Sequence, residues 1–180
     1  EISADRKNST RNVLYIDQPS TGLGVRDFYL EQKHAAALQA YTKSIAEKAR
    51  FFAEKSHLDE EKIAKSASQV VELETRLANI SEPAESRRDH ERMYNPYTVE
   101  QLQKEFPILD WRRLFSLVVP AGIEKYFDDS REVFVTEVNY LKQLGQLLKT
   151  VNNCTLADFI LFRTTEVYDQ ALPKRFRETN

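Results

Sequence analysis

The segment with the strongest metal-binding character is His90-Glu91-Arg92-Met93-Tyr94. A helical HExxH motif binds zinc because its two imidazoles lie one turn apart and reach the same ion, while the Glu takes a proton from metal-bound water. Tyr94 stands in the place of the second His, so half of the ligand pair is missing. The other two histidines, His34 and His57, are far from this segment in the sequence. We therefore predict no metal ligand in the chain and interpret all three histidines as ordinary polar residues.

Two of the four glycines form the segment Gly22-Leu23-Gly24, which lies between a short β-type run and a helical pattern. A phosphate-binding loop of the GxGxxG type needs a third glycine where this chain has Asp27, whose charge repels phosphate. We interpret the segment as a structural corner. Pro19, Gly22 and Gly24 turn the chain, and Arg26 and Asp27 begin the next helix, where the Asp27 carboxylate suits the positive end of the helix dipole.

Acidic pairs and charges on apolar helix faces are the remaining candidates for acid–base chemistry. Asp128-Asp129 and Glu60-Glu61 lie among charged residues, which favours solvated turns or first helical turns. Glu74 and Arg163 each lie on the apolar face of a predicted helix, so each needs a partner. We favour an ion pair or carbonyl contacts that fix helix packing, because no second acid or base is evident near either residue. No nucleophile with a base stands out, so we predict no catalytic and no cofactor-binding residue.

The composition is that of a globular protein. The 180 residues, of which 41% are hydrophobic, suffice for one domain or for part of a larger one. The 26 basic and 28 acidic side chains give a formal net charge of -2, so no strong field attracts nucleic acid or anionic lipid. The chain begins at Glu1 and lacks a signal peptide or an apolar run of about 18 residues. We therefore expect an excised piece of a longer protein.

The cysteine and the asparagine sequons give information about the cellular compartment of the protein. Cys154 is the only cysteine, which excludes an internal disulfide and any CxxC motif. Three Asn-x-Ser/Thr sequons occur, at Asn8, Asn79 and Asn153. Each suits a surface position of a secreted protein if the chain meets the glycosylation machinery.

Apolar spacing predicts the elements of the first half. Val13 to Ile16 follow a turn-rich polar cluster and read as a strand, or as half of a hairpin. Apolar residues at spacings of three and four predict a long helix over residues 26–55. Residues 56–58 interrupt the pattern, and Asp59 caps a second helix that extends to Ile80. The two helices should pack as an antiparallel hairpin.

The second half contains shorter elements. Residues 81–96 read as a charged connection with at most a short helical turn. Four helices and one strand are then predicted. The first helix is opened by a Thr98–Gln101 capping box and ended by Pro107, and the second is capped by Asp110 and stopped by Pro120 and Gly122. A strand over residues 132–136 and a helix over residues 138–151 follow, and a last, long helix is capped by Thr155 and has Leu156, Phe159, Ile160, Val167 and Leu172 on its apolar face.

The predicted fold class is mainly α, a multi-helix lobe with long antiparallel helices and a minor β element near the N-terminus. We treat residues 1–180 as a single segment of one domain, with a β-strand or hairpin region over residues 1–18 and a helical lobe over residues 26–180.

Several stretches, in the same order, resemble the neprilysin and endothelin-converting-enzyme family of zinc endopeptidases. The segment from Ile16 to Leu30 resembles the family pattern of Asp-Gln-Pro, a Gly-Leu pair, and Arg-Asp followed by two aromatic residues. The family's helix with an acidic core and its Tyr-Asn segment before a buried Trp are also matched. The stretches that carry the resemblance are IDQPSTGLGVRDFYL, VVELETRLANIS, RRDHERMYNPYTVEQLQKEFPILDW, EVFVTEVNYLKQLGQLL and FILFRTTEVYDQALPKRFRE.

The resemblance implies an extracellular protein, either a membrane-anchored ectodomain or a secreted enzyme, with two mainly helical lobes that enclose a cavity for small peptides. It places this chain in the amino-terminal half, mostly in the non-catalytic lobe that lids the active site. The family's zinc ligands lie in the carboxy-terminal half. The implied partners are that catalytic half and its peptide substrates, with no nucleic acid, and zinc is a cofactor of the parent enzyme alone.

One departure from the family concerns cysteines. Many members have a cysteine at the position of Leu30, so the disulfide that it would form is absent here. A buried or unpaired thiol is the default interpretation of Cys154, and a bridge to another part of the parent is the alternative. For function, the alternative to the peptidase lobe is a non-enzymatic binding or scaffold protein derived from this lobe.

Overall fold

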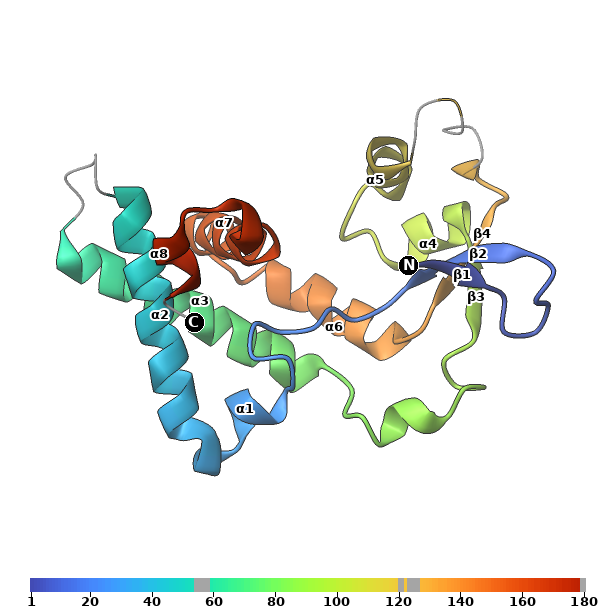
Figure 1. Ribbon diagram of the computed structural model, residues 1–180. Helices are drawn as coiled ribbons and strands as arrows, with labels where there is room; N and C mark the ends of the chain where they lie inside the picture. Colours follow the sequence, from blue (N-terminus) through green and yellow to red (C-terminus); the bar gives the residue numbers. More distant parts are fainter. Residues whose placement is uncertain (54–58, 120–121, 123–126, 179–180) are drawn as a thin grey trace. The chain divides into compact units, whose positions relative to one another are not determined.

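The computed structural model describes residues 1–53, 59–119, 122 and 127–178 (Figure 1). The predicted interruption at residues 56–58, His57 and the predicted stop at Pro120 lie outside these described residues. The chain divides into two compact units, each built from two separate segments. We call them the sheet unit (Glu1–Pro19 and Glu82–Lys149) and the helical unit (Ser20–Ser81 and Thr150–Asn180). The fold is mainly α with a small sheet, which confirms the predicted class.

The sheet unit contains a four-stranded sheet in the order β1-β2-β4-β3 (Figure 1). β1 (Ile2–Ala4) and β2 (Asn12–Ile16) form an antiparallel hairpin, β2 pairs in parallel with β4 (Glu132–Val135), and β3 (Asn95–Thr98) pairs antiparallel with β4. The predicted hairpin and the predicted strand near residues 132–136 are therefore confirmed.

β3 corrects the prediction that residues 81–96 form only a connection. Asn95 and Pro96 pair with Val135 and Phe134 of β4. Proline lacks an N–H and is tolerated mainly in edge strands, where a missing donor breaks no second ladder. β3 lies at the sheet edge, so Pro96 fits there although it reads as a loop residue in the sequence. The predicted short helical turn in the connection is η2 (Ser86–Arg88).

Three helices pack on the sheet and bury its inner face. They are α4 (Val99–Glu105), α5 (Trp111–Val118) and α6 (Val138–Leu148). The main cluster of buried side chains comprises Val99, Leu102, Phe106, Trp111, Phe115, Val133, Val135 and Leu141. The predicted caps are confirmed, because Thr98 and Gln101 exchange both bonds of a capping box and Asp110 accepts from the Arg113 N–H.

Glu137 ties the charged connection to the end of β4. Its side chain is fully buried and accepts hydrogen bonds from Arg87 at 3.2 Å and from Arg92 at 2.7 Å and 3.1 Å. A buried carboxylate is tolerated only when such partners replace its lost hydration. The two arginines therefore fix the connection against the sheet unit.

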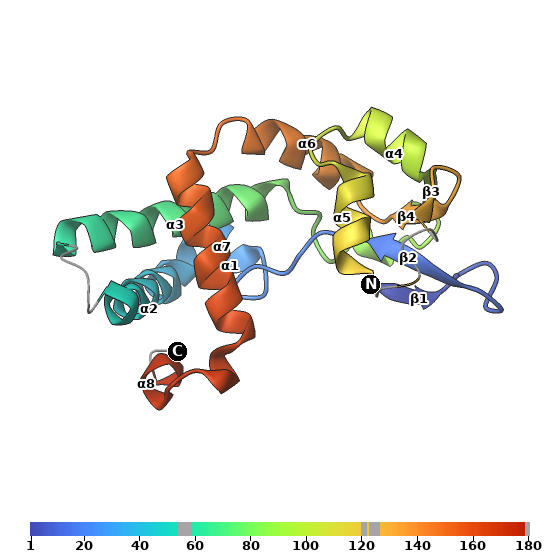
Figure 2. The same ribbon diagram turned by 90° about the horizontal axis from the view of Figure 1, so that it is seen from above.

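The helical unit is built around two consecutive helices, α2 (Ala35–Ala53) and α3 (Glu60–Ile80), which run in opposite directions in Figure 2. Asp59 caps α3 by accepting from the Lys62 N–H, as predicted. The predicted single helix over residues 26–55 is wrong at its start. The backbone of Glu31 is extended, with φ -102° and ψ 127°, and divides this region into α1 (Asp27–Leu30), η1 (Gln32–His34) and α2.

The last long helix, α7 (Asn153–Val167), packs on α3 and is followed by η4 (Asp169–Ala171) and α8 (Lys174–Arg177). The predicted cap at Thr155 is wrong, because the side chain of Asn152 accepts from the Cys154 N–H and Thr155 is buried inside the helix. The predicted apolar face is partly wrong. Phe159 packs against the core, but the buried aromatic residue of α7 is Phe162, whereas Ile160 and Val167 are exposed.

Candidate functional site

The HERMY segment forms a turn in the sheet unit and offers no zinc site. His90 is exposed, and Glu91 pairs with Lys7 at 2.8 Å. The Tyr94 hydroxyl donates to Asp5 at 2.9 Å. Within the described parts of the chain, no three His, Cys, Asp or Glu side chains gather in a way that suits a metal ion. The residues of this segment hold the N-terminal hairpin and do not fit zinc.

The glycine segment forms a corner of the helical unit. A Cβ atom on Gly22 would overlap the hydroxyl group of Tyr41, so any larger residue at this position requires the Tyr41 side chain to shift. Gly24 has a φ of 80°, a left-handed conformation that glycine adopts without strain. Pro19, at the end of the sheet unit, is exposed.

Arg26 and Asp27 lie where the corner meets α1. Arg26 donates from Nε to the Ala78 carbonyl at 3.2 Å, near the end of α3, and the same carbonyl also accepts from the Ser81 N–H. Asp27 lies in the first turn of α1, the end of a helix that favours negative charge. The corner therefore connects α1 to the end of α3.

A buried polar cluster lies behind this corner. The Tyr29 hydroxyl donates to Oε2 of Glu74 at 2.6 Å and accepts from the Leu23 N–H at 3.1 Å. The Arg163 guanidinium lies 3.9 Å from Oε1 of Glu74, so the two charges singled out from the sequence do lie close together. Arg163 also pairs with Glu166 one turn along α7. Glu74 is 1% exposed, and these partners stabilise its charge.

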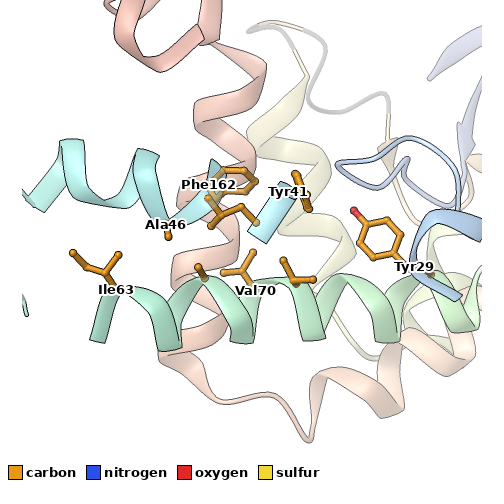
Figure 3. Close-up of a cluster of buried hydrophobic side chains, with 10 residues drawn as sticks. Tyr29, Tyr41, Ala46, Ile63, Val70 and Phe162 are labelled. Carbon is orange, nitrogen blue, oxygen red and sulfur yellow. The ribbon is translucent and has the colours of Figure 1, made fainter. Parts of the chain in front are cut away.

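Tyr29 also belongs to the hydrophobic core of the helical unit, where its ring packs with other aromatic rings (Figure 3). The ring of Tyr41 meets that of Tyr29 edge to face at a centroid distance of 6.4 Å, and that of Phe162 at 5.9 Å. Figure 3 shows Tyr41 and Phe162 over the side of α3 that carries Val70. Offset and edge-to-face pairs of this kind add directional packing to apolar burial.

The apolar surroundings shift the ionisation of the hydroxyl and carboxyl groups. Burial, and then the neighbouring Glu74 carboxylate, raises the pKa of Tyr29. Burial likewise raises the pKa of Tyr41, with further contributions from the charges of Glu74 and Glu166. Burial also raises the pKa of Glu166, although the Arg163 charge opposes that rise. The site therefore keeps both phenols neutral at ordinary pH.

An open cavity of about 750 Å³ lies beside the cluster. Its walls comprise residues 21–23 of the corner, Ala37, Ala40, Tyr41, Ser44 and Lys48 of α2, and Arg163, Glu166 and Val167 of α7. Lys48 is buried, and its ammonium lies 5.4 Å from the centroid of the Phe162 ring. The Tyr41 hydroxyl is buried yet makes no hydrogen bond to any residue that the structure describes. The cavity therefore combines apolar wall residues with the charged side chains of Lys48, Arg163 and Glu166.

Sequence reasoning singled out Glu74 and Arg163 but not Tyr29, Tyr41 or Glu166. Glu166 could have been found, because it follows Arg163 by three residues and therefore lies beside it on the helix surface. The apolar spacing of residues 26–55 places Tyr41 only on an apolar helix face. Its position against the corner depends on a contact between separate elements, which the sequence does not display.

The three sequons and the cysteine lie on the surface. Asn8, Asn79 and Asn153 are exposed, and the Thr10 hydroxyl donates to Oδ1 of Asn8 at 2.6 Å. Cys154 is also exposed, which corrects the part of the default interpretation that buries this thiol. Within residues 1–53, 59–119 and 127–178, no helix combines the length and apolar character needed to cross a bilayer.

The fold and the chain-wide match define the class of protein. The model of the amino-terminal domain of peptidase family M13 matches residues 1–180. The chain belongs to this family of zinc metalloproteases and corresponds to its amino-terminal domain, which confirms the resemblance inferred from the sequence.

Among individual proteins, endothelin-converting enzyme 1 of Cavia porcellus and that of Homo sapiens are each 30% identical to this chain over 181 residues, covering 99% of the chain and 23% of the relative. Neprilysin-1 of Caenorhabditis elegans is 28% identical, with 97% of the chain and 24% of that protein covered. The inhibitor complex of the Mycobacterium tuberculosis zinc metalloprotease Zmp1 is 26% identical, with a TM-score of 0.70, covering 99% of this chain and 29% of Zmp1. The chain thus spans about a quarter of the length of the curated relatives it matches.

The contact between Gly22 and Tyr41 predicts different outcomes for two glycine substitutions. Gly22→Ala should lower the free energy of unfolding by about 1–3 kcal/mol, because the added methyl group overlaps the Tyr41 hydroxyl. Gly145→Ala is the matched control, since its Cβ would lie 3.8 Å from Ile108 and alanine favours the interior of α6 by about 0.5–1 kcal/mol. Urea unfolding followed by circular dichroism measures both. Equal stability of the two variants would contradict the contact.

The bond between Tyr29 and Glu74 predicts a loss of stability in Tyr29→Phe. At pH 7 the variant should lose about 1.5–3 kcal/mol, because a buried carboxylate loses a donor. Tyr41→Phe is the control, and it should lose little because that hydroxyl makes no such bond. Urea unfolding monitors both variants, and equal losses would contradict this assignment.

The raised pKa of Tyr29 adds a pH dependence to this difference. Because the pKa of Tyr29 is higher in the folded chain than its usual value of 10, its contribution is present below pH 10 and is lost as the pH rises through the folded value. The free energy of unfolding of the wild type should therefore fall above pH 10. The fall should be shallower in Tyr29→Phe, and parallel curves for the two proteins would show that Tyr29 does not contribute.

Proposed function

We propose that this chain is the non-catalytic lid-lobe segment of a neprilysin-like zinc metalloendopeptidase that cleaves small peptides. The observation that carries the proposal is the family match over residues 1–180, combined with a sequence that has no HExxH motif. The His90-Glu91 pair does not fit a zinc ion, because His90 lies in an exposed turn and Glu91 is engaged by Lys7. Zinc binding and peptide cleavage then belong to the carboxy-terminal part of a longer polypeptide, which is the partner of this lobe.

In this proposal the chain forms part of the wall of the substrate cavity. A lobe that covers an active site excludes large substrates by its shape and keeps water out. Both effects require rigid packing of the lobe. The Tyr29–Glu74 bond and the tight contact of Gly22 with Tyr41 provide such rigidity inside the helical unit. The bonds of Arg87 and Arg92 to Glu137 do the same inside the sheet unit. We treat residues 1–180 as one segment of the peptidase amino-terminal domain.

The peptidase proposal is tested by zinc content and by cleavage of a small peptide. The isolated 180-residue chain should bind no stoichiometric zinc and show no phosphoramidon-sensitive cleavage. The longer polypeptide encoded by the same gene should bind one zinc per chain and cleave the peptide. His90→Ala in the longer polypeptide is the control, and it should keep both zinc and activity, because His90 is not a ligand.

Two outcomes contradict this function. Tight zinc binding by the 180-residue chain, lost in His90→Ala, would show that the HERMY segment is a metal site. A complete reading frame without HExxH would instead support a non-enzymatic binding or scaffold protein derived from this lobe.

We also propose that the protein is extracellular, as an anchored ectodomain or a secreted enzyme. The support is the exposure of Asn8, Asn79 and Asn153, which places each acceptor asparagine on the surface of the folded chain. After expression through a eukaryotic secretory pathway, peptide N-glycosidase F should lower the mass of the protein, and Asn→Gln at each sequon should remove one glycan. Asn12→Gln, at an exposed asparagine outside any sequon, is the control. A mass unchanged by the glycosidase would contradict glycosylation in this pathway.

A further inference from the structure

The sequon at Asn8 lies in the connection between β1 and β2 and forms a tight turn. The Arg11 N–H donates to the Asn8 carbonyl at 3.2 Å, which closes a four-residue β-turn with Asn8 at its first position, where asparagine is common. Asn8, Ser9 and Thr10 are all exposed. The turn therefore presents the whole sequon to solvent, outside any helix or strand.

This turn brings the two groups that define a sequon into contact. The Thr10 hydroxyl donates to Oδ1 of Asn8 at 2.6 Å, and the Thr10 N–H donates to the same oxygen at 3.2 Å. An enzyme that recognises Asn-x-Ser/Thr must contact the carboxamide and the hydroxyl two positions later in one site. At Asn8 the folded chain already holds both groups side by side, so recognition requires no unfolding of a regular element.

Asp5 anchors the turn from the protein side. It is 2% exposed and accepts from the Lys7 N–H at 2.9 Å and from Nε of Arg11 at 2.7 Å. The Tyr94 hydroxyl donates to the same carboxylate at 2.9 Å. Within the described part of the chain, the hydrogen bonds of the Asn8 side chain all use Oδ1, which leaves Nδ2 free to react. The contacts that fix the turn therefore do not involve the atom to which a glycan is attached.

The other two sequons lie in or beside long helices. Side chains two positions apart in a helix do not face each other, so the carboxamide and the hydroxyl point in different directions. Asn153 is the first residue of α7 and is exposed, whereas Thr155 is buried. Asn79 lies in the last turn of α3, and the Ser81 hydroxyl donates back to the Leu77 carbonyl at 2.8 Å. At both sites the helix must open locally before one enzyme can contact both groups.

We propose that Asn8 is the asparagine that an oligosaccharyltransferase modifies in the folded protein, whereas Asn79 and Asn153 are modified only while their helices are unfolded. This inference rests on the proposed extracellular location, which brings the chain to the transferase and to its donor, an oligosaccharide joined through pyrophosphate to a lipid.

The transfer at Asn8 preserves the turn. Nδ2 forms a bond to C1 of the first sugar, and the bond from C1 to the pyrophosphate oxygen breaks. The lipid pyrophosphate leaves with the bonding electrons, and a base of the transferase takes one Nδ2 proton. Because Oδ1 remains a carbonyl acceptor, its two bonds from Thr10 persist in the product.

Rates of glycan transfer to the folded protein test this order. The longer polypeptide encoded by the same gene is expressed in tunicamycin-treated cells, which make no lipid-linked donor. The fraction with a cooperative thermal transition is then incubated with purified oligosaccharyltransferase and donor. Mass spectrometry gives the rate at each sequon, and synthetic peptides of residues 4–13, 75–84 and 149–158 give the rates without the fold.

The measured quantity is the ratio of the rate in the folded protein to the rate in the peptide. This ratio should be more than about tenfold higher at Asn8 than at Asn79 and Asn153, because transfer to the last two requires local opening of a helix. A smaller difference would overturn the proposal.

Substitutions in the longer polypeptide provide a second test. Asn8→Gln should abolish the fast transfer, whereas Ser9→Ala, at the exposed middle position of the sequon, should leave it nearly unchanged. Asn152→Ala removes the cap of α7, where the side chain accepts from the Cys154 N–H at 2.8 Å. The first turn then opens more often, so the ratio at Asn153 should rise about fivefold against a peptide with the same substitution. An unchanged ratio would show that the helix does not protect Asn153, and would overturn the proposal.

The outcomes separate this inference from the proposed function. A folded polypeptide with zinc-dependent peptidase activity that accepts no glycan at Asn8 would retain the function and overturn only the inference. Fast transfer to Asn8 in a polypeptide without zinc-dependent activity would support the inference and contradict only the peptidase function.

Discussion

The burial of Glu74 is the constraint on which the helical unit depends. A carboxylate that is 1% exposed loses its hydration, and the loss is tolerable only if donors and positive charge replace water. Tyr29 supplies the closest donor and Arg163 the positive charge. These two residues come from α1 and α7, so satisfying one carboxylate on α3 places two other helices. The corner at Gly22 follows from the same demand, because the chain must turn tightly to bring α1 against α3.

The sheet unit solves a similar problem with different residues. Glu137 has a fully buried side chain at the end of β4, and Arg87 and Arg92 reach it from the charged connection. In each unit a buried carboxylate joins elements that are distant in the sequence. Ionic contacts of this kind define geometry more than they add stability, because desolvation offsets much of their attraction. That division of roles suits a lobe whose proposed task is to hold a shape around chemistry performed elsewhere.

Membership in peptidase family M13 and the absence of an HExxH sequence are compatible, because this chain spans only about a quarter of the length of its relatives. The exposed apolar side of α7 is consistent with a chain that forms part of a larger protein. Apolar residues facing water contribute nothing to folding of this unit, whereas they contribute strongly once another surface covers them. The proposed lobe function therefore rests on the family match.

The sequence by itself determined the features that depend on near neighbours. The capping box of Thr98, the cap at Asp59 and the apolar periodicity of α3 involve residues a few positions apart, so their types and spacing suffice to predict them. The family pattern likewise identified the class. The tertiary structure decided the rest, as at the edge strand around Pro96, which depends on pairing with β4. The buried side of α7 also depends on tertiary contacts, since this helix has apolar residues on more than one side and periodicity does not select one face. The pairing of Tyr29 with Glu74 joins residues separated by 45 positions, and only folding brings such groups close enough to satisfy each other.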